Sequence, residues 1–206
     1  MTRQLDSTGL KRLHRAWRRR PVGRVGLLLD NVQSPFNVGA ILRTAAALRV
    51  DHLWLAGETA SPTHGKTAKT ALGTQRYLEW TWHDTAADAA GAARAAGYAI
   101  VGLELTDDAA PLPEARLAAS VCLMVGHEDR GLPPASLALC DEIAFIPQLG
   151  RVGSLNVATA TAIALYEVRR RAWTQGDPDG DGRDGAGEPV RNPWEAGRAG
   201  DLPSAP

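Results

Sequence analysis

Short apolar runs, bounded by glycine, proline or charged residues, recur along most of the chain. Runs of this length predict strands that are buried on both faces. We expect such strands at 25–29, 53–55, 98–105, 121–125 and 143–146. A shorter run rich in aromatic residues, at 77–82, predicts one further strand.

Between these runs, apolar residues recur at helical spacing. One helix is expected through Ile41 to Leu48 and another, rich in alanine, at 84–97. A third is expected from Ser154, a plausible N-cap, to about residue 168. Its predicted core-facing residues are Leu155, Ala158, Ala162 and Leu165, with Val157 and Ile163 beside them. Strands that alternate with helices predict an α/β fold, with a mostly parallel sheet flanked by helices.

A polar loop containing glycine follows a predicted strand in three places, at 30–39, 126–131 and 147–153. Such a loop before a helix places backbone N–H groups at the helix N-terminus, where they can bind a ligand. A single loop of this kind is most often an ordinary strand–helix turn. Its repetition makes a functional role the better hypothesis.

The three loops resemble, in order and spacing, the three motifs of the SPOUT superfamily of RNA methyltransferases, on its SpoU/TrmH branch. The first motif is carried by Asn37, Gly39 and Arg43-Thr44-Ala45. The second is carried by Gly126, Glu128 and Gly131. The third is carried by Ile146-Pro147, Gly150 and Ser154-Leu155-Asn156-Val157. The resemblance covers about residues 24–170, and three motifs in order are far more specific than any one of them.

The resemblance implies transfer of a methyl group from S-adenosylmethionine to a ribose 2′-hydroxyl of RNA. It also implies a C-terminal trefoil knot, a rare exception among folds, and a homodimer. The implied cofactor-binding residues are Leu103, Glu104, Gly126, Ile146 and Leu155. The implied catalytic residues are Arg43, Asn37, Glu128, Ser154 and Asn156.

Methyl transfer to a 2′-hydroxyl divides several tasks among these polar groups. A 2′-hydroxyl is a very weak acid and must lose its proton as it attacks. Arg43 is the candidate for activating it, as an unusual base or through a phosphate contact, and its high pKa makes the base role harder. Asn37 and Asn156 would position the loops and the substrate, while Glu128 and Ser154 would fix Arg43. Asn37 and Ser154 can equally serve as loop or helix caps.

Basic residues are concentrated near the N-terminus, although the formal net charge of the chain is +0. They are Lys11, Arg12, Arg15, Arg18, Arg19, Arg20 and Arg24. Leu10, Leu13, His14 and Trp17 recur at helical spacing among them, which predicts a basic amphipathic helix. Such a helix is either an RNA-binding arm or a solvated face. Lys66 and Lys69 likewise either contact RNA phosphate or are solvated lysines. No run is apolar and long enough for a signal peptide or a membrane span.

From Gly176 onward, glycine, proline and acidic residues dominate, which predicts a disordered tail. Within it, residues 177–188 match the spacing of an EF-hand loop. Asp184 stands where that loop usually has an apolar residue, and Pro189 and Pro193 oppose an exiting helix. We therefore predict no metal site. The expected organisation is a basic arm at 1–23, a methyltransferase domain at 24–175 and the tail at 176–206.

The two cysteines, Cys122 and Cys140, lack the spacing of a metal site, and isolated thiols favour a reducing, cytoplasmic location. No P-loop, dinucleotide-binding or nucleophile-elbow motif is present. Two alternatives stay open, namely a catalytically silent RNA-binding protein on the same fold and an unrelated nucleotide-binding α/β enzyme. Several relatives that act on ribosomal RNA have an N-terminal RNA-binding domain, which is missing here. Transfer RNA is therefore the expected substrate over ribosomal RNA.

Overall fold

The computed structural model of the chain describes residues 4–18 and 23–175. Cα packing divides the chain into two units, Gly23–Arg170 and a unit formed by Met1–Val22 with Arg171–Pro206. The predicted tail and its EF-hand-like stretch lie outside the described residues. In the second unit, the basic segment forms the predicted helix, α1 (Ser7–Arg18), and buries none of its side chains.

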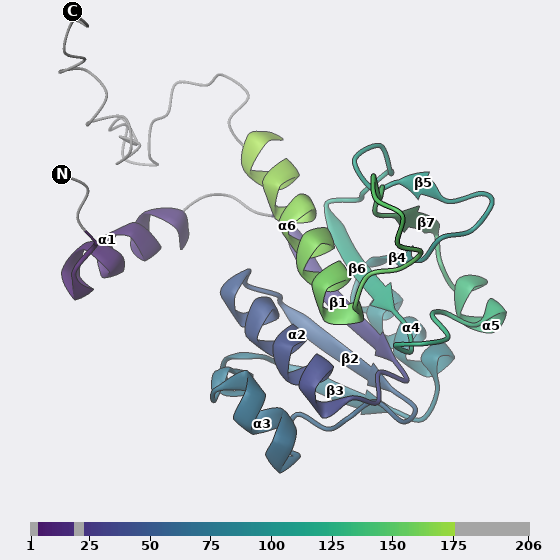
Figure 1. The fold of residues 1–206 in the computed structure, drawn as a ribbon, viewed down its shortest axis with the longest axis horizontal. Coiled ribbons are helices and arrows are strands. Elements are labelled where there is room, and N and C mark those ends of the chain that lie inside the picture. The colour runs from purple at the N-terminus through teal and green to yellow at the C-terminus, as the bar shows by residue number, and fades with distance from the viewer. Residues whose placement is uncertain (1–3, 19–22, 176–206) are drawn as a thin grey trace, which may run out of the picture. The chain divides into compact units, whose positions relative to one another are not determined.

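The larger unit is built on a 7-stranded sheet in the order β3-β2-β1-β6-β4-β7-β5 (Figure 1). Its strands are β1 (Arg24–Asp30), β2 (His52–Ala56), β3 (Trp80–His83), β4 (Ala99–Leu103), β5 (Ala110–Pro111), β6 (Ser120–Val125) and β7 (Glu142–Phe145). Neighbouring strands pair in parallel throughout this sheet. The predicted α/β class with a parallel sheet is therefore confirmed.

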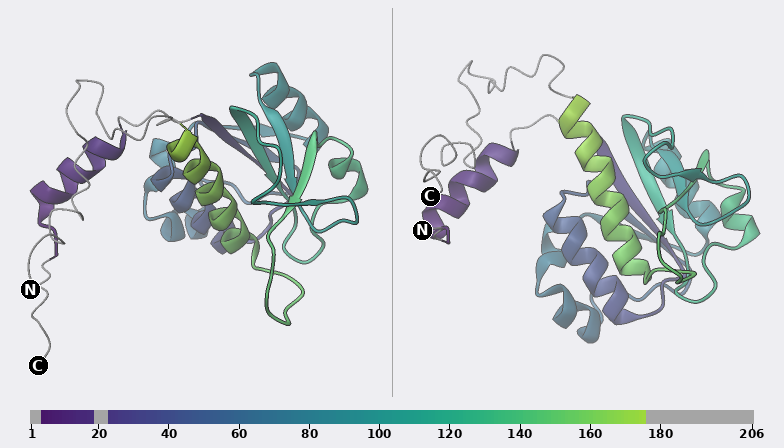
Figure 2. Two further views of the ribbon diagram at one scale, coloured as in Figure 1. Left: turned by 90° about the horizontal axis from the view of Figure 1, so that it is seen from above. Right: turned by 45° about the horizontal axis from the view of Figure 1, so that its top comes forward.

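Helices cover both faces of the sheet (Figure 2). They are α2 (Pro35–Ala47), α3 (Gly65–Ala71), α4 (Ala86–Ala95), α5 (Pro134–Leu137) and α6 (Val157–Gln175), with a 3-10 turn, η1 (Thr74–Tyr77). One core joins α2, α3 and α6 to alternate residues of the central strands, such as Leu27 and Leu123. The other core joins α4 to the opposite face, through residues such as Leu28 and Met124. Apolar residues on both faces explain why the strand sequences are continuous apolar runs. None of the helices in the described ranges is long and apolar enough to cross a membrane.

Two predicted elements differ from the structure. The run at 77–82 is a 3-10 turn followed by a strand, because the Leu78 N–H bonds to the Gln75 carbonyl and leaves Tyr77 exposed. No strand was expected at 106–118, but this segment contains β5, which includes Pro111 and pairs with β7 at the edge of the sheet. An edge position tolerates proline, since one side of the strand needs no ladder hydrogen bond.

The last helix begins two residues later than predicted. Ser154 is not its N-cap. Instead the Asn156 side-chain oxygen accepts hydrogen bonds from the N–H groups of Ala158 (3.0 Å) and Thr159 (3.2 Å). Asparagine is as good an N-cap as serine, so the sequence offered two equivalent starts. Its buried face includes Thr161, Ala164, Leu165 and Val168, while Ile163, predicted beside the core, is exposed.

Candidate active site

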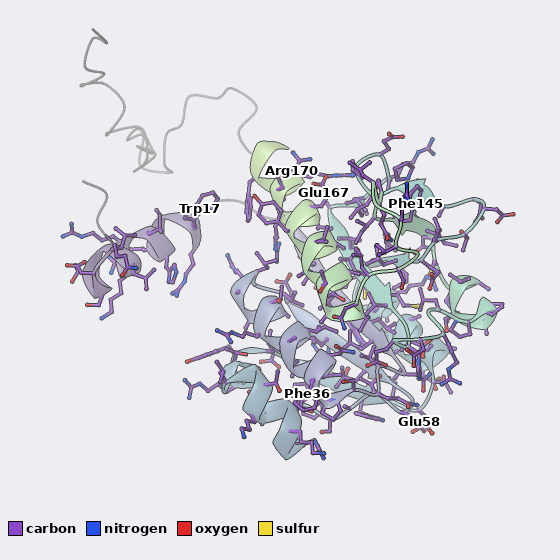
Figure 3. All side chains as sticks on the ribbon, viewed as in Figure 1. Trp17, Phe36, Glu58, Phe145, Glu167 and Arg170 are labelled. Atoms are coloured by element: carbon purple, nitrogen blue, oxygen red, sulfur yellow. The ribbon has the colours of Figure 1, made fainter. Side chains whose placement is uncertain are left out.

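A cavity of about 450 Å³ lies at the carboxyl ends of β4, β6 and β7. Parallel sheets generally bind ligands at this end of their strands. Phe145, labelled in Figure 3, belongs to its apolar wall. The cavity is lined by all of the predicted cofactor-binding residues, which are Leu103, Glu104, Gly126, Ile146 and Leu155. The predicted catalytic residues Glu128 and Ser154 also line it.

One wall of the cavity is a tight loop that follows β6. The backbone groups of His127 and Gly131 bond to each other in both directions, at 3.1 and 2.8 Å. A side chain at Gly126 would overlap the Gly131 backbone, so only glycine fits there. The Glu104 carboxylate accepts the Leu132 N–H at 2.8 Å. Glu104 therefore fixes the loop that presents Glu128.

Glu128 connects the cavity to the loop before α2. Its carboxylate accepts hydrogen bonds from the Ser34 N–H at 2.8 Å, the Gln33 N–H at 3.2 Å and the Asn37 side-chain amide at 3.0 Å. Burial acts to raise the pKa of the Glu128 carboxyl. The hydrogen bonds from Asn37 and from backbone N–H groups outweigh burial and hold the pKa below its ordinary value of 4.5. The group is therefore a carboxylate at neutral pH.

Asn37 in turn joins the first motif to the third. Its side-chain oxygen accepts a hydrogen bond from the Asn156 amide at 3.0 Å. Asn156 caps α6 with its other side-chain atom. Glu128, Asn37 and Asn156 thus form one chain of hydrogen bonds across residues that are far apart in the sequence. This chain sets the positions of the N-termini of α2 and α6 relative to the cavity.

Arg43 and Ser154 lie outside this chain of hydrogen bonds. Arg43 is exposed on α2 and does not line the cavity, and within the described part of the chain its guanidinium has no hydrogen bond or ion pair. Ser154 lines the cavity as an exposed residue. The expected contact between Glu128 and Arg43 is not formed in this structure, because Glu128 bonds to Asn37 and the Ser34 backbone instead.

Several groups at the site were not predicted from the sequence. The backbone N–H groups of Gln33 and Ser34 bind Glu128, and the Ser34 hydroxyl caps α2 by accepting the Asn37 N–H at 3.4 Å. Asp129 and Arg130 line the cavity. Ser34 before Pro35 carried the usual signal of a helix start. Backbone donors carry no signal in a sequence, since every residue except proline has one.

Replacing Glu128 with glutamine should destabilise the protein by about 1 kcal/mol at pH 7, because one charge-assisted hydrogen bond is lost. A lowered pKa means that the carboxylate stabilises the fold above pH 4.5 and that this contribution is lost as pH falls through the folded-state pKa. The gap between wild type and Glu128→Gln should therefore close in acid. Urea unfolding at a series of pH values measures it, with exposed Glu114→Gln as the control. If the difference in unfolding free energy does not change with pH, the Glu128 carboxylate does not have this stabilising role.

The fold and the site define an α/β protein with a cavity at the carboxyl ends of its central strands. Comparison with known proteins identifies the family within this class. Residues 24–166 match the SpoU rRNA Methylase family, and the chain belongs to that family.

The relatives include enzymes named for two kinds of RNA. The tRNA (guanosine(18)-2'-O)-methyltransferase of Escherichia coli (strain K12) is 32% identical over 151 residues, which are 72% of this chain and 64% of the relative. The 23S rRNA (guanosine(2553)-2'-O)-methyltransferase of Bacillus subtilis (strain 168) is 34% identical over 143 residues, 69% of this chain and 57% of the relative. The chain thus spans less than two thirds of the length of these relatives.

A solved structure with a similar fold is the AdoMet bound rRNA methyltransferase from Sinorhizobium meliloti. It is 32% identical with a TM-score of 0.68, and the match covers 76% of this chain and 60% of that protein.

Proposed function

We propose that the protein transfers a methyl group from S-adenosylmethionine to a ribose 2′-hydroxyl of RNA. The observation that carries the proposal is that Glu128 lines the cavity and also holds the Asn37–Asn156 pair. One carboxylate thereby couples a small-molecule pocket to a second set of polar groups. Membership of the SpoU family and the names of the relatives support the same reaction.

The cavity suits the chemistry of S-adenosylmethionine, which supplies a methyl group on a positively charged sulfur when it is bound. Leu103, Ile146 and Leu155 offer apolar walls for an adenine ring. Three acidic side chains line the cavity against one arginine, so the lining favours a cation. They are Glu104, Glu128 and Asp129, against Arg130.

The chain's own residues would then divide the remaining tasks. The apolar walls exclude water from the reacting centre. The Glu128–Asn37–Asn156 chain holds the start of α2, so the helix that carries Arg43 has a fixed position. We assign to Arg43 the contact with the RNA that favours loss of the 2′-hydroxyl proton. Its exposed guanidinium is suited to bidentate recognition of a phosphate beside the reacting ribose.

Calorimetry with S-adenosylmethionine, beside methyl transfer to bulk RNA, tests the proposal. RNA binding without cofactor binding would instead indicate a catalytically silent RNA-binding protein. We propose transfer RNA over ribosomal RNA as the substrate. Mapping ribose methylation in RNA from a deletion strain tests that choice, and a missing methyl group in ribosomal RNA alone contradicts it.

We further propose that the protein works as a homodimer. Large apolar side chains are exposed on α6 and on the loop that precedes it, and they include Ile163, Tyr166, Leu149 and Val152. Leu149 is fully exposed at 103%, although the preceding residue, Gln148, lines the cavity. A second copy would remove this surface from water. Sedimentation of the full chain as a monomer at all concentrations contradicts the proposal.

The C-terminal knot and a cytoplasmic location complete the proposal. Threading of the C-terminal segment through a loop is supported by membership of the family. An experimental structure in which that segment passes through no loop contradicts it. The free thiols of Cys122 and Cys140 suit a reducing compartment, and localisation of a tagged chain tests this.

The basic arm is proposed to hold RNA phosphates. Replacing Arg18, Arg19 and Arg20 with alanine should weaken RNA binding and reduce the slope of log affinity against log salt by about two to three, because up to three phosphate contacts are lost. Affinity for S-adenosylmethionine should not change. Filter binding across salt concentrations measures the slope, and an unchanged slope means that the arm is a solvated face. Arg19 and Arg20 lie outside the described residues.

A further inference from the structure

Acidic residues are absent from two segments that pack together beside the candidate site. Residues 31–50 and 59–78 contain no aspartate or glutamate, although the chain has as many acidic as basic residues overall. The first segment forms α2, and the second forms α3 and η1. Their basic residues are Arg43, Arg49, Lys66, Lys69 and Arg76. An electrostatic surface of one sign favours a partner of the opposite sign.

The helices α2 and α3 are in close contact. A side chain at Gly39 of α2 would lie 2.6 Å from Thr70 Cβ and 2.8 Å from the Thr67 carbonyl oxygen of α3. The start of α2 is bonded to Glu128 through Asn37. The second segment is therefore joined to the candidate site by a single, tightly packed helix.

The outer surface of this second segment combines cations with exposed apolar groups. Thr67 and Ala71 face the core, so Lys66 and Lys69, one turn apart, face outward. Leu72, the C-cap residue that follows α3, is 66% exposed. Within residues 4–18 and 23–175, neither lysine has an ion pair. Phe36, labelled at the start of α2 in Figure 3, is 64% exposed beside this surface.

Tyr77 is held in place although it is exposed. Tyr77 is 67% exposed, and the centroid of its ring lies 4.8 Å from the Arg76 guanidinium carbon. Arg76 also donates a hydrogen bond of 2.7 Å to the Tyr77 hydroxyl. A fixed aromatic ring loses little entropy when a flat ligand stacks on it. Single-stranded nucleic acids bind to surfaces of this kind, where bases stack on aromatic rings and phosphates meet cations.

We propose that Lys66, Lys69, Leu72, Arg76 and Tyr77 form a platform that binds a single-stranded part of the RNA substrate. An unpaired base stacks on Tyr77, and the flanking phosphates contact the three cations. The platform rests on the proposed function and specifies how the substrate is held. A stacked base requires unpaired RNA, because the bases of a duplex are not accessible.

Binding of full-length variants to a mixed-sequence single-stranded RNA of about 12 nucleotides tests the platform. Tyr77→Ala should lose about tenfold in affinity, the size of one lost base stack, and Tyr77→Phe should lose little. Lys66→Ala with Lys69→Ala should reduce the salt slope by about 1.4, since each phosphate contact on a single strand contributes about 0.7. Arg116→Ala, which removes an exposed arginine near the opposite edge of the sheet, is the matched control and should have no effect.

A duplex of the same strand provides the specificity test, and Tyr77→Ala should not change its affinity. Wild-type affinity of both Tyr77→Ala and the lysine double variant for the single strand overturns the platform. If these variants lose self-association but bind RNA as wild type does, the platform is also overturned, because the surface then contacts a second copy of the chain. Methyl transfer separates the two proposals. If wild type and Tyr77→Ala methylate RNA equally well, the platform fails and the proposed function stands, whereas a wild type that binds no S-adenosylmethionine contradicts the function.

Discussion

Replacing Arg43 with alanine should lower methyl-transfer turnover by at least about a hundredfold, the usual loss when a proton-transfer group is removed. Arg43 is exposed on α2 among apolar and small residues, and within the described ranges no other side chain bonds its guanidinium. Its removal therefore leaves no cavity and no unpaired group in the protein. Folding should be unchanged, and so should cofactor binding, because Arg43 does not line the cavity.

Methyl transfer to bulk RNA and calorimetry with S-adenosylmethionine together measure this result. Arg43→Lys separates the two roles considered for the residue. A lysine still anchors a phosphate as a point charge, so partial recovery of turnover indicates an anchor. Near-normal transfer by Arg43→Ala contradicts the assignment, and lost cofactor binding makes Arg43 a structural residue.

Replacing Arg169 with leucine should destabilise the fold, unlike Arg43→Ala. We expect a loss of about 3–5 kcal/mol of unfolding free energy. Arg169 is only 2% exposed, and its guanidinium donates to the carbonyls of Leu48 (2.8 Å), Gly23 (2.5 Å) and Arg49. Asp51 is 3.8 Å away. Leucine fills part of the space but leaves these carbonyls without a donor, and unpaired buried acceptors are costly.

The loss of Arg169 should also affect the candidate site, because Arg169 helps to hold α2 and α6 together. Its bond to Leu48 ties α6 to the C-terminal end of α2. The bond between Asn156 and Asn37 ties the N-terminal ends of the same two helices. The pair is therefore held at both ends, and the loss of the Arg169 bond weakens the support of the end at the candidate site.

Thermal and urea unfolding measure the effect of Arg169→Leu. A chain of this size should lose about 10 °C in melting temperature. Arg169→Lys should fall between leucine and wild type, because an ammonium cannot donate to several carbonyls in the fork geometry of a guanidinium. Arg43→Ala is the matched control, since it also removes an arginine and should leave stability unchanged. A melting temperature for Arg169→Leu equal to that of wild type contradicts the argument.

Local patterns were sufficient for most of the fold. The apolar runs at 25–29 and 121–125 are core strands, with Leu27 and Leu123 fully buried. The alanine-rich segment at 84–97 contains α4, and Thr85 is its N-cap. These predictions succeed because burial on both faces of a parallel sheet imposes a continuous apolar run, and helix caps impose a short polar signal. Where two caps were equivalent, at Ser154 and Asn156, local pattern did not distinguish them.

The motifs also located the cavity. Gly126, Ile146 and Leu155 line it because each follows a strand, and parallel strands end at one edge. By itself, then, the sequence determined the class of fold. Through the resemblance of its motifs, it also predicted the edge of the sheet where the cavity lies and several of the residues that line it, since order and spacing along the chain carry both.

Only the tertiary structure decided which polar groups meet. Asn37 and Asn156 are in contact across 119 positions, and Glu128 reaches Asn37 across 91. The backbone donors at Gln33 and Ser34 follow from packing of distant segments. So does the placing of the buried cation Arg169 among the carbonyls of Gly23, Leu48 and Arg49. The order of residue types along the chain does not specify such distances. A hydrogen bond depends on a separation near 3 Å, and only the folded chain sets that separation.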